Sequence, residues 1–213
     1  MTDEFGIEPR GKRRVAWWAA ALALLVLVVV VALVQDRAGS ADEALLTGAD
    51  FGDGYEVAAL TPDQLARAGT GLPAGLEPAE CAELLRARPE PATASTARAV
   101  SARRDGTAYL ELVAPADDVP TWDRDRLDEL VGTCATTTFD DGTVEFSRLD
   151  QPADGYAFAA RVSSGDGVVT VGVAMAAVDD HVVVLTGIAR GDLDRREFAR
   201  LVRRAGERVS AHL

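Results

Sequence analysis

An uninterrupted apolar run over residues 15–34 constrains this 213-residue chain more than any other feature of its sequence. The run contains no charged or polar side chain. At about 1.5 Å per residue, a helix of this length spans about 30 Å, which is the thickness of a bilayer core. Because lipid offers the backbone no hydrogen-bond partners, only a helix suits such a segment. We therefore expect residues 15–34 to form one transmembrane helix that lies in the lipid bilayer.

The charges beside this run predict its orientation. The basic residues just before it are Arg10, Lys12, Arg13 and Arg14. After the run, Arg37 stands beside an acidic residue. Because positive residues favour the cytoplasmic side, we expect a cytoplasmic tail at residues 1–14. Residues 35–44 would then be a tether, and residues 45–213 one domain outside the plasma membrane.

A cleaved signal peptide is the alternative for the N-terminal segment. Such a peptide has an apolar core of about 7–15 residues and a cleavage site of small residues. Ala38-Gly39-Ser40 offers only a poor site, and the apolar run is longer than usual. Both possibilities remain open, and both place the following domain outside the cytoplasm.

The composition excludes several classes of function. The net charge of −12 would repel phosphates, so nucleic acid is not an expected partner. A hydrophobic content of 48% argues against wholesale disorder. Two cysteines are too few for a disulfide-dense scaffold or a four-thiolate zinc site. The heavy use of Ala, Arg, Asp and Val suggests a GC-rich genome.

The two cysteines, Cys81 and Cys134, are expected to form one disulfide. An exported domain lies in an oxidising compartment, where an even pair of cysteines is usually bonded. The alternative is two buried free thiols. A catalytic cysteine is a weaker hypothesis, because the sequence offers only His181 and His212 as imidazole partners.

Turn signals and hydrophobic periodicity predict an antiparallel sheet with helices. The expected strands lie near 55–60 and at 96–104, 107–113, 136–139, 143–149, 156–163, 168–177 and 181–189. The expected helices are a short one within 45–51, one that begins at Thr61, and others at 78–88, 123–133 and after Asp194. Short turns join the strand pairs, so the fold class is α+β, with an antiparallel sheet and helices packed on one face.

The C-terminal helix has an apolar stripe that must find a surface. Its members are Phe198, Leu201, Val202, Ala205 and Val209. We expect the stripe to cover the sheet face bearing Val169, Val171 and Val173, or the one bearing Val182, Val184 and Ile188. The arginines of this helix would then stay in water. The alternative is a basic amphipathic helix that lies on lipid.

Several stretches carry a family resemblance. They are Leu45-Leu46-Thr47, Pro78-Ala79-Glu80-Cys81, Leu130-Val131-Gly132-Thr133-Cys134, the late hairpin over 177–184 and the C-terminal helix. With these, most of residues 43–210 resembles the PknH-like extracellular sensor domain of mycobacterial receptor-type Ser/Thr protein kinases, which related actinobacterial membrane proteins and lipoproteins share. The resemblance implies a sensor-like or ligand-binding fold without naming a ligand. The second disulfide of that family has no counterpart here, because the corresponding positions are Gly172 and Ala189.

No group of residues forms a catalytic motif. His181 beside Asp179 and Asp180 could make a metal or acid-base cluster, or simply a polar turn. The other acidic candidates lack calcium-loop spacing and predict turns and solvated edges; they are Asp50, Asp53, Asp117, Asp118, Asp140 and Asp141. Trp122 could line a pocket or pack at a helix start.

These observations favour a non-enzymatic function at the cell envelope. We expect a membrane-anchored, extracytoplasmic binding or sensor-like module that needs no metal and no cofactor. Its ligand-binding residues are not identified by the sequence, and the envelope ligand or protein that it binds is unknown. The alternative function is a structural or protein-interaction partner of an envelope complex, without a small ligand.

Overall fold

The computed structural model describes residues 43–61, 64, 77–78, 80–81, 97–118, 124–139 and 142–213. The predicted tail, the predicted transmembrane helix at 15–34 and most of the predicted tether lie outside these residues. Within the part of the chain that is described, no helix is both long and apolar enough to cross a bilayer. The helix predicted at Thr61 is described only at its start, where Gln64 Oε1 accepts from the Thr61 amide at 2.7 Å, as a capping box requires.

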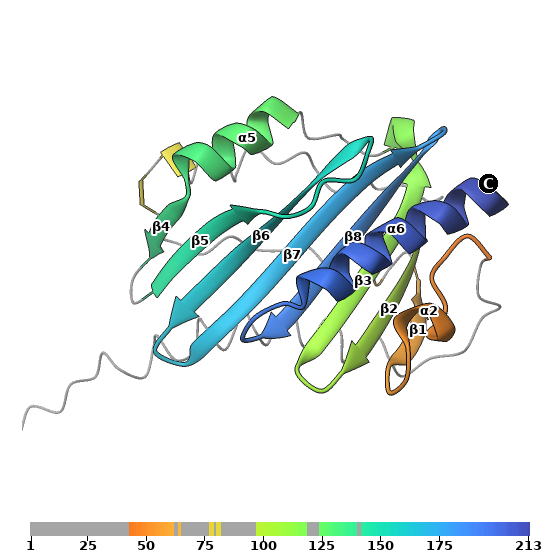
Figure 1. The fold of residues 1–213 in the computed structure, drawn as a ribbon, viewed down its shortest axis with the longest axis horizontal. Coiled ribbons are helices and arrows are strands. Elements are labelled where there is room, and N and C mark those ends of the chain that lie inside the picture. The colour runs from red at the N-terminus through yellow and green to blue at the C-terminus, as the bar shows by residue number, and fades with distance from the viewer. Residues whose placement is uncertain are drawn as a thin grey trace, which may run out of the picture.

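The described residues form one eight-stranded antiparallel sheet (Figure 1). Its strands are β1 (Glu56–Leu60), β2 (Arg98–Arg104), β3 (Thr107–Pro115), β4 (Thr136–Phe139), β5 (Gly142–Arg148), β6 (Gly155–Ser164), β7 (Gly167–Val178) and β8 (His181–Arg190). Their order across the sheet is β1-β2-β3-β8-β7-β6-β5-β4. The predicted strands are therefore confirmed to within a few residues.

Two meanders build this sheet. Strands β1 to β3 follow one another in chain order, and strands β4 to β8 form the second run. The two runs meet where β8 pairs with β3, in a register from Thr107↔Ala189 to Pro115↔His181. The Asp105-Gly106 turn joins β2 to β3 with Gly106 at φ 72°, as a tight hairpin needs.

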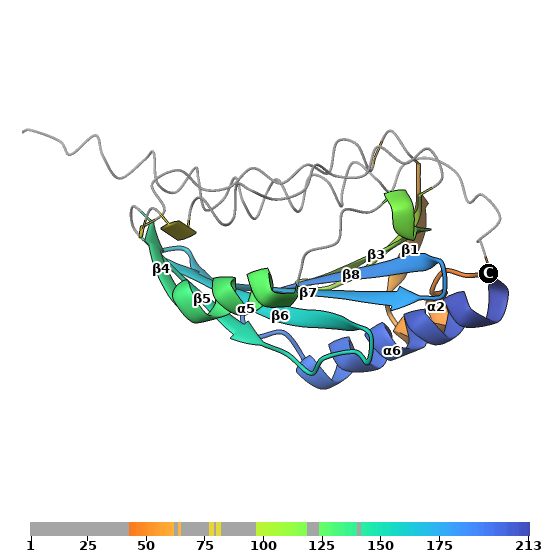
Figure 2. The same cartoon turned by 90° about the horizontal axis from the view of Figure 1, so that it is seen from above.

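Three α-helices and one 3-10 turn accompany the sheet in the described residues. They are α2 (Gly48–Phe51), α5 (Arg124–Thr133), α6 (Arg195–His212) and the 3-10 turn η1 (Ala116–Asp118). The predicted cap of α6 is confirmed, because Asp194 Oδ1 accepts from the amides of Arg196 and Glu197 at 2.9 and 3.1 Å. Figure 2 shows α6 lying along one side of the curved sheet.

Helix α6 packs on a different sheet face from the one predicted. Its stripe residues Phe198, Leu201, Ala205 and Val209 are buried. They pack on one sheet face, here called the α6 face, which bears Gly172, Ala174, Val183, Leu185 and Gly187. The two faces predicted to receive this helix were therefore wrong: Val169, Val171 and Val173, and Val182, Val184 and Ile188, lie on the other side of the sheet. A helix can approach closely where the side chains are small, and a Cβ on Gly187 would lie 2.9 Å from Phe198 Cδ2.

Helices lie on both faces, so the prediction of helices on one face was also wrong. The opposite face, here called the second face, bears Val144, Phe146, Tyr156, Phe158 and Val173. Leu130 of α5 packs there, together with the two cysteines. Between Val171 and Ala176, strand β7 is apolar at both alternating sets of positions, with larger side chains on the second face and glycine or alanine on the α6 face. A sheet of this kind needs cover on both sides.

Candidate functional site

A disulfide fixes the end of α5 beside the edge of the sheet. Cys81 and Cys134 are bonded, as predicted, and both are fully buried. Nearby, Glu77 and Thr138 of β4 exchange two backbone hydrogen bonds of 2.9 Å. The chain around residues 77–81 is therefore attached to the β4 edge, and α5 is held over the second face.

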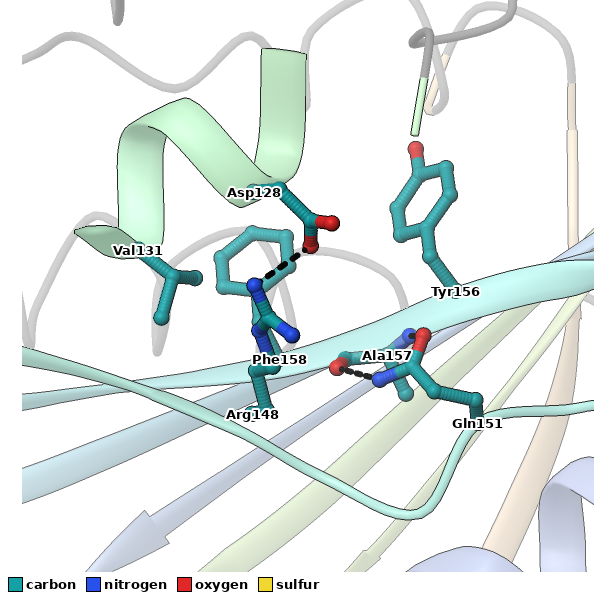
Figure 3. Close-up of a pocket in the computed structure, with 7 residues that line it drawn as sticks. All are labelled: Asp128, Val131, Arg148, Gln151, Tyr156, Ala157 and Phe158. Atoms are coloured by element: carbon teal, nitrogen blue, oxygen red, sulfur yellow. Dashed lines mark hydrogen bonds and ion pairs between the residues drawn. The ribbon is translucent and has the colours of Figure 1, made fainter. Parts of the chain in front are cut away.

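A pocket of about 200 Å³ lies between α5 and the strands that it covers (Figure 3). Its described lining residues are Asp128, Val131, Arg148, Gln151, Tyr156, Ala157 and Phe158. Asp128 and Val131 come from α5, whereas Arg148 ends β5 and the aromatic residues stand on β6. In Figure 3, Arg148 rises from the sheet toward Asp128 of α5, and Tyr156 rises from the sheet on the other side of the open space. We call this site the second-face pocket.

An ion pair forms one wall of the second-face pocket. Arg148 Nη2 lies 2.8 Å from Asp128 Oδ1, and the two side chains are 59% and 50% exposed. Exposed pairs of this kind contribute about 0–1 kcal/mol to stability, so either partner can exchange for another charge at little cost. Across the pocket, burial raises the pKa of Tyr156 to about 12, so its phenol stays neutral at physiological pH.

Gln151 has a structural role at the base of the pocket. Its Nε2 donates to the carbonyls of Leu149 and Ala157 at 2.8 and 2.7 Å, and its Oε1 accepts from the Ala157 amide at 2.9 Å. The side chain thereby acts as a substitute for a strand partner where β5 leads into β6. Because both its polar atoms are occupied, the charged groups left for a ligand are Arg148 and Asp128, with the Tyr156 hydroxyl as a neutral polar group.

A second group of charged residues ties the segment at 43–51 to α6. Arg200, Arg204 and Arg208 recur every four residues on this helix. Arg200 Nη1 donates to the Asp50 carbonyl at 2.7 Å, and Arg204 Nε lies 2.9 Å from Asp50 Oδ1. Arg208 Nε donates to the Leu45 carbonyl at 2.6 Å. The Arg204 hydrogen bond and those from Thr47 lower the pKa of Asp50 despite its burial, which acts in the opposite direction.

These contacts correct two expectations. Asp50 was predicted to lie at a turn or a solvated edge, but it is only 8% exposed. Arg208 was predicted to stay in water, but its side chain is only 17% exposed because it binds the chain that precedes α2. Both residues hold the start of the domain against its C-terminal helix.

Glu111 lies fully buried on the α6 face beside this segment. Its Oε2 accepts from the Leu46 amide at 2.7 Å, whereas its Oε1 has no hydrogen-bond partner. Burial raises the pKa of Glu111 to about 7, opposed by the Leu46 hydrogen bond and by Arg208. An acid with one unpartnered oxygen is stable there mainly in its protonated form.

Two tyrosines share one carboxylate at the start of α6. The hydroxyls of Tyr55 and Tyr109 each donate to Glu197 at 3.3 Å, and Arg104 lies 4.4 Å from the centre of the Tyr55 ring. Burial raises the pKa of both phenols. These groups satisfy one another, so the cluster fixes α6 and offers no free polar group.

The remaining sequence candidates do not assemble into a site. His181 Nδ1 lies 2.6 Å from Asp180 Oδ1 at the β7–β8 turn, where Asp179 has φ 53°. Among the described residues no group of three or more His, Cys, Asp or Glu side chains could hold a metal ion. Asp117 and Asp118 lie in η1. Trp122, Asp140 and Asp141 are outside the described residues.

The pocket residues Arg148 and Asp128 were not identified from the sequence. They are 20 positions apart, on a strand and a helix, and no local motif joins them. Glu111 could have been found, because strand alternation places it on the same face as Tyr109 and Val113 within an otherwise apolar strand.

Comparison with known proteins adds two structures of low similarity. No protein-family model matches the chain, and a search of curated proteins found no match. An uncharacterized Mycobacterium smegmatis protein, an Rv0999 ortholog, is 16% identical with a TM-score of 0.47, over 77% of this chain and 90% of that chain. The extracellular domain of PknH from Mycobacterium tuberculosis is 13% identical with a TM-score of 0.43, over 81% of this chain and 100% of that chain. The second is the kind of domain that the sequence resembles, but values this low assign no family and support no argument about function.

Proposed function

We propose that this chain is a membrane-anchored, extracytoplasmic binding module of the cell envelope that has no catalytic activity of its own. The observation that carries the proposal is the second-face pocket, which combines an exchangeable ion pair with apolar walls. Small-molecule sites in proteins typically combine apolar lining with a few placed polar groups.

Two further observations support the location. The domain contains a buried disulfide, and such bonds persist in oxidising compartments outside the cytoplasm. The apolar run at 15–34 and the basic residues before it predict that the domain is exported and anchored. The arginines of α6 would then hold the first residues after the tether against the body of the domain.

The alternative function is a protein-interaction partner without a small ligand. Interfaces of that kind often present a contiguous apolar patch of several hundred Å². Among the described residues the large apolar side chain that is exposed is Leu213, at the C-terminus. This favours the small-ligand function over a flat apolar contact, at least for the described surface.

Native mass spectrometry of the full chain, extracted in mild detergent, tests the proposal. We expect a bound small molecule on the wild-type chain and its loss in Val131→Trp, which fills the second-face pocket. Leu213→Trp adds the same bulk at an exposed position and is the matched control, which should retain the bound molecule. A bare wild-type chain would contradict the proposal, and a bound protein in its place would favour the alternative.

A further inference from the structure

We propose that the second-face pocket binds a free α-amino acid with a compact apolar side chain, held as a zwitterion by Arg148 and Asp128. This inference rests on the proposed function and names the class of ligand. It starts from the polar groups that are available in the pocket. Gln151 is engaged with backbone atoms, which leaves the guanidinium and the carboxylate of the ion pair as the charged groups, together with the neutral hydroxyl of Tyr156.

The two charges in the pocket are opposite and adjacent. A simple anion that paired with Arg148 would displace Asp128 and lie beside its carboxylate, on a chain whose net charge is already −12. A simple cation that paired with Asp128 would displace Arg148 in the same way. A zwitterion satisfies both groups at once: its carboxylate binds the guanidinium, where two parallel hydrogen bonds can form, and its ammonium binds Asp128.

The pair can open for such a ligand. Both side chains are at least half exposed, and within the described part of the chain a single ion pair of 2.8 Å joins them (Figure 3). Exposed pairs contribute little to stability, so separating the two groups costs little. The ligand would then restore each charged contact that it breaks.

The size of the pocket and its apolar walls determine which side chain the ligand can carry. A volume of about 200 Å³ is somewhat larger than the cavity of about 150 Å³ that accommodates benzene. One branched or single-ring side chain therefore fits together with the two charged groups. Val131 and Phe158 are partly buried and pack in the same apolar cluster as Tyr156, which provides an apolar lining for that side chain.

Isothermal titration calorimetry on the full chain in detergent tests this inference. The probes are L-leucine, L-valine and L-phenylalanine, with N-acetyl-L-leucine and L-leucinamide as analogues that each lack one charge. The protein variants are Arg148→Gln and Asp128→Asn. The matched control is Arg103→Gln. It breaks a similar ion pair on the neighbouring strands β1 and β2, where Arg103 Nη2 lies 2.7 Å from Glu56 Oε2.

We expect at least one of the three amino acids to bind. Each analogue and each pocket variant should weaken binding about tenfold or more, because each removes a hydrogen bond between charged groups. Arg103→Gln should bind as the wild type does. The inference is overturned if none of the three amino acids binds, or if the acetylated or amidated form binds as tightly as L-leucine. If mass spectrometry still finds a different bound molecule, the proposed function stands and only the ligand class fails.

Discussion

Glu111 makes the stability of the domain depend on pH in a way that one substitution should remove. The carboxyl group is fully buried with one oxygen unpartnered, and burial raises its pKa from 4.5 to about 7. The unfolded chain ionises this group near pH 4.5, whereas the folded chain keeps it protonated until about pH 7. Its contribution to stability is therefore greatest below pH 4.5 and is lost as the pH rises through about 7.

The size of this effect follows from the pKa. A rise from 4.5 to about 7 corresponds to about 3 kcal/mol, at about 1.4 kcal/mol for each tenfold change in proton affinity. Glu111→Gln cannot ionise, although its amide still offers an oxygen to the Leu46 amide. Between pH 4.5 and 7.5, the free energy of unfolding of the variant should rise relative to the wild type by about 3 kcal/mol. Asp50 and Arg208 face Glu111 in both proteins, so the direct contributions of these two residues to stability largely cancel in this difference.

Urea unfolding of residues 38–213 at several pH values measures this difference directly. Glu129→Gln, at an exposed position of α5, controls for the loss of a surface carboxylate. Relative to the wild type, the free energy of unfolding should change severalfold more between pH 4.5 and 7.5 for Glu111→Gln than for Glu129→Gln. A difference from the wild type that stays constant between pH 4.5 and 7.5 would refute the reasoning, because Glu111 would then ionise alike in the folded and unfolded chains.

Two further predictions concern the packing of the domain. Cys81→Ser should lower the free energy of unfolding by about 4 kcal/mol, because it releases a loop with a sequence separation of 53. Chemical reduction of the wild type should lower it by the same amount. An unchanged urea midpoint would contradict a stabilising role for the disulfide. Leu201→Asp should lower it by more than about 2 kcal/mol, because it buries an unpaired charge at a fully buried position of α6. Leu213→Asp, at the exposed C-terminus, is the control for the second change, and equal midpoints for both variants would mean that α6 is not docked.

Local patterns predicted most of the described elements. The Asp105-Gly106 hairpin, the Asp194 cap and the alternating residues of β6 and β7 each depend on neighbours in the sequence. The pairing of β3 with β8 does not, because it joins residues 66 to 82 positions apart, and no turn signal marks it. Strand pairing over such distances is fixed by the packing of the whole sheet.

The same limit applies to the faces and to the pocket. From Val171 to Ala176, strand β7 alternates valine or methionine with glycine or alanine, so both faces look apolar there. The volume of the side chains, rather than their polarity, decides that α6 packs over Gly172 and Gly187. The second-face pocket depends on α5 lying above β5, which brings Asp128 within 2.8 Å of Arg148. That placement follows from tertiary packing and the disulfide, and sequence periodicity does not predict it.

The central claim is that the domain lies outside the cytoplasm. Cysteine labelling in intact cells tests it most directly. Asp166→Cys places a thiol in the exposed β6–β7 turn, and Thr2→Cys places one in the predicted cytoplasmic tail. A maleimide that cannot cross the membrane should label Asp166→Cys in intact cells, whereas Thr2→Cys should react only after lysis. Labelling of Thr2→Cys but not Asp166→Cys in intact cells would place the domain in the cytoplasm and contradict the account.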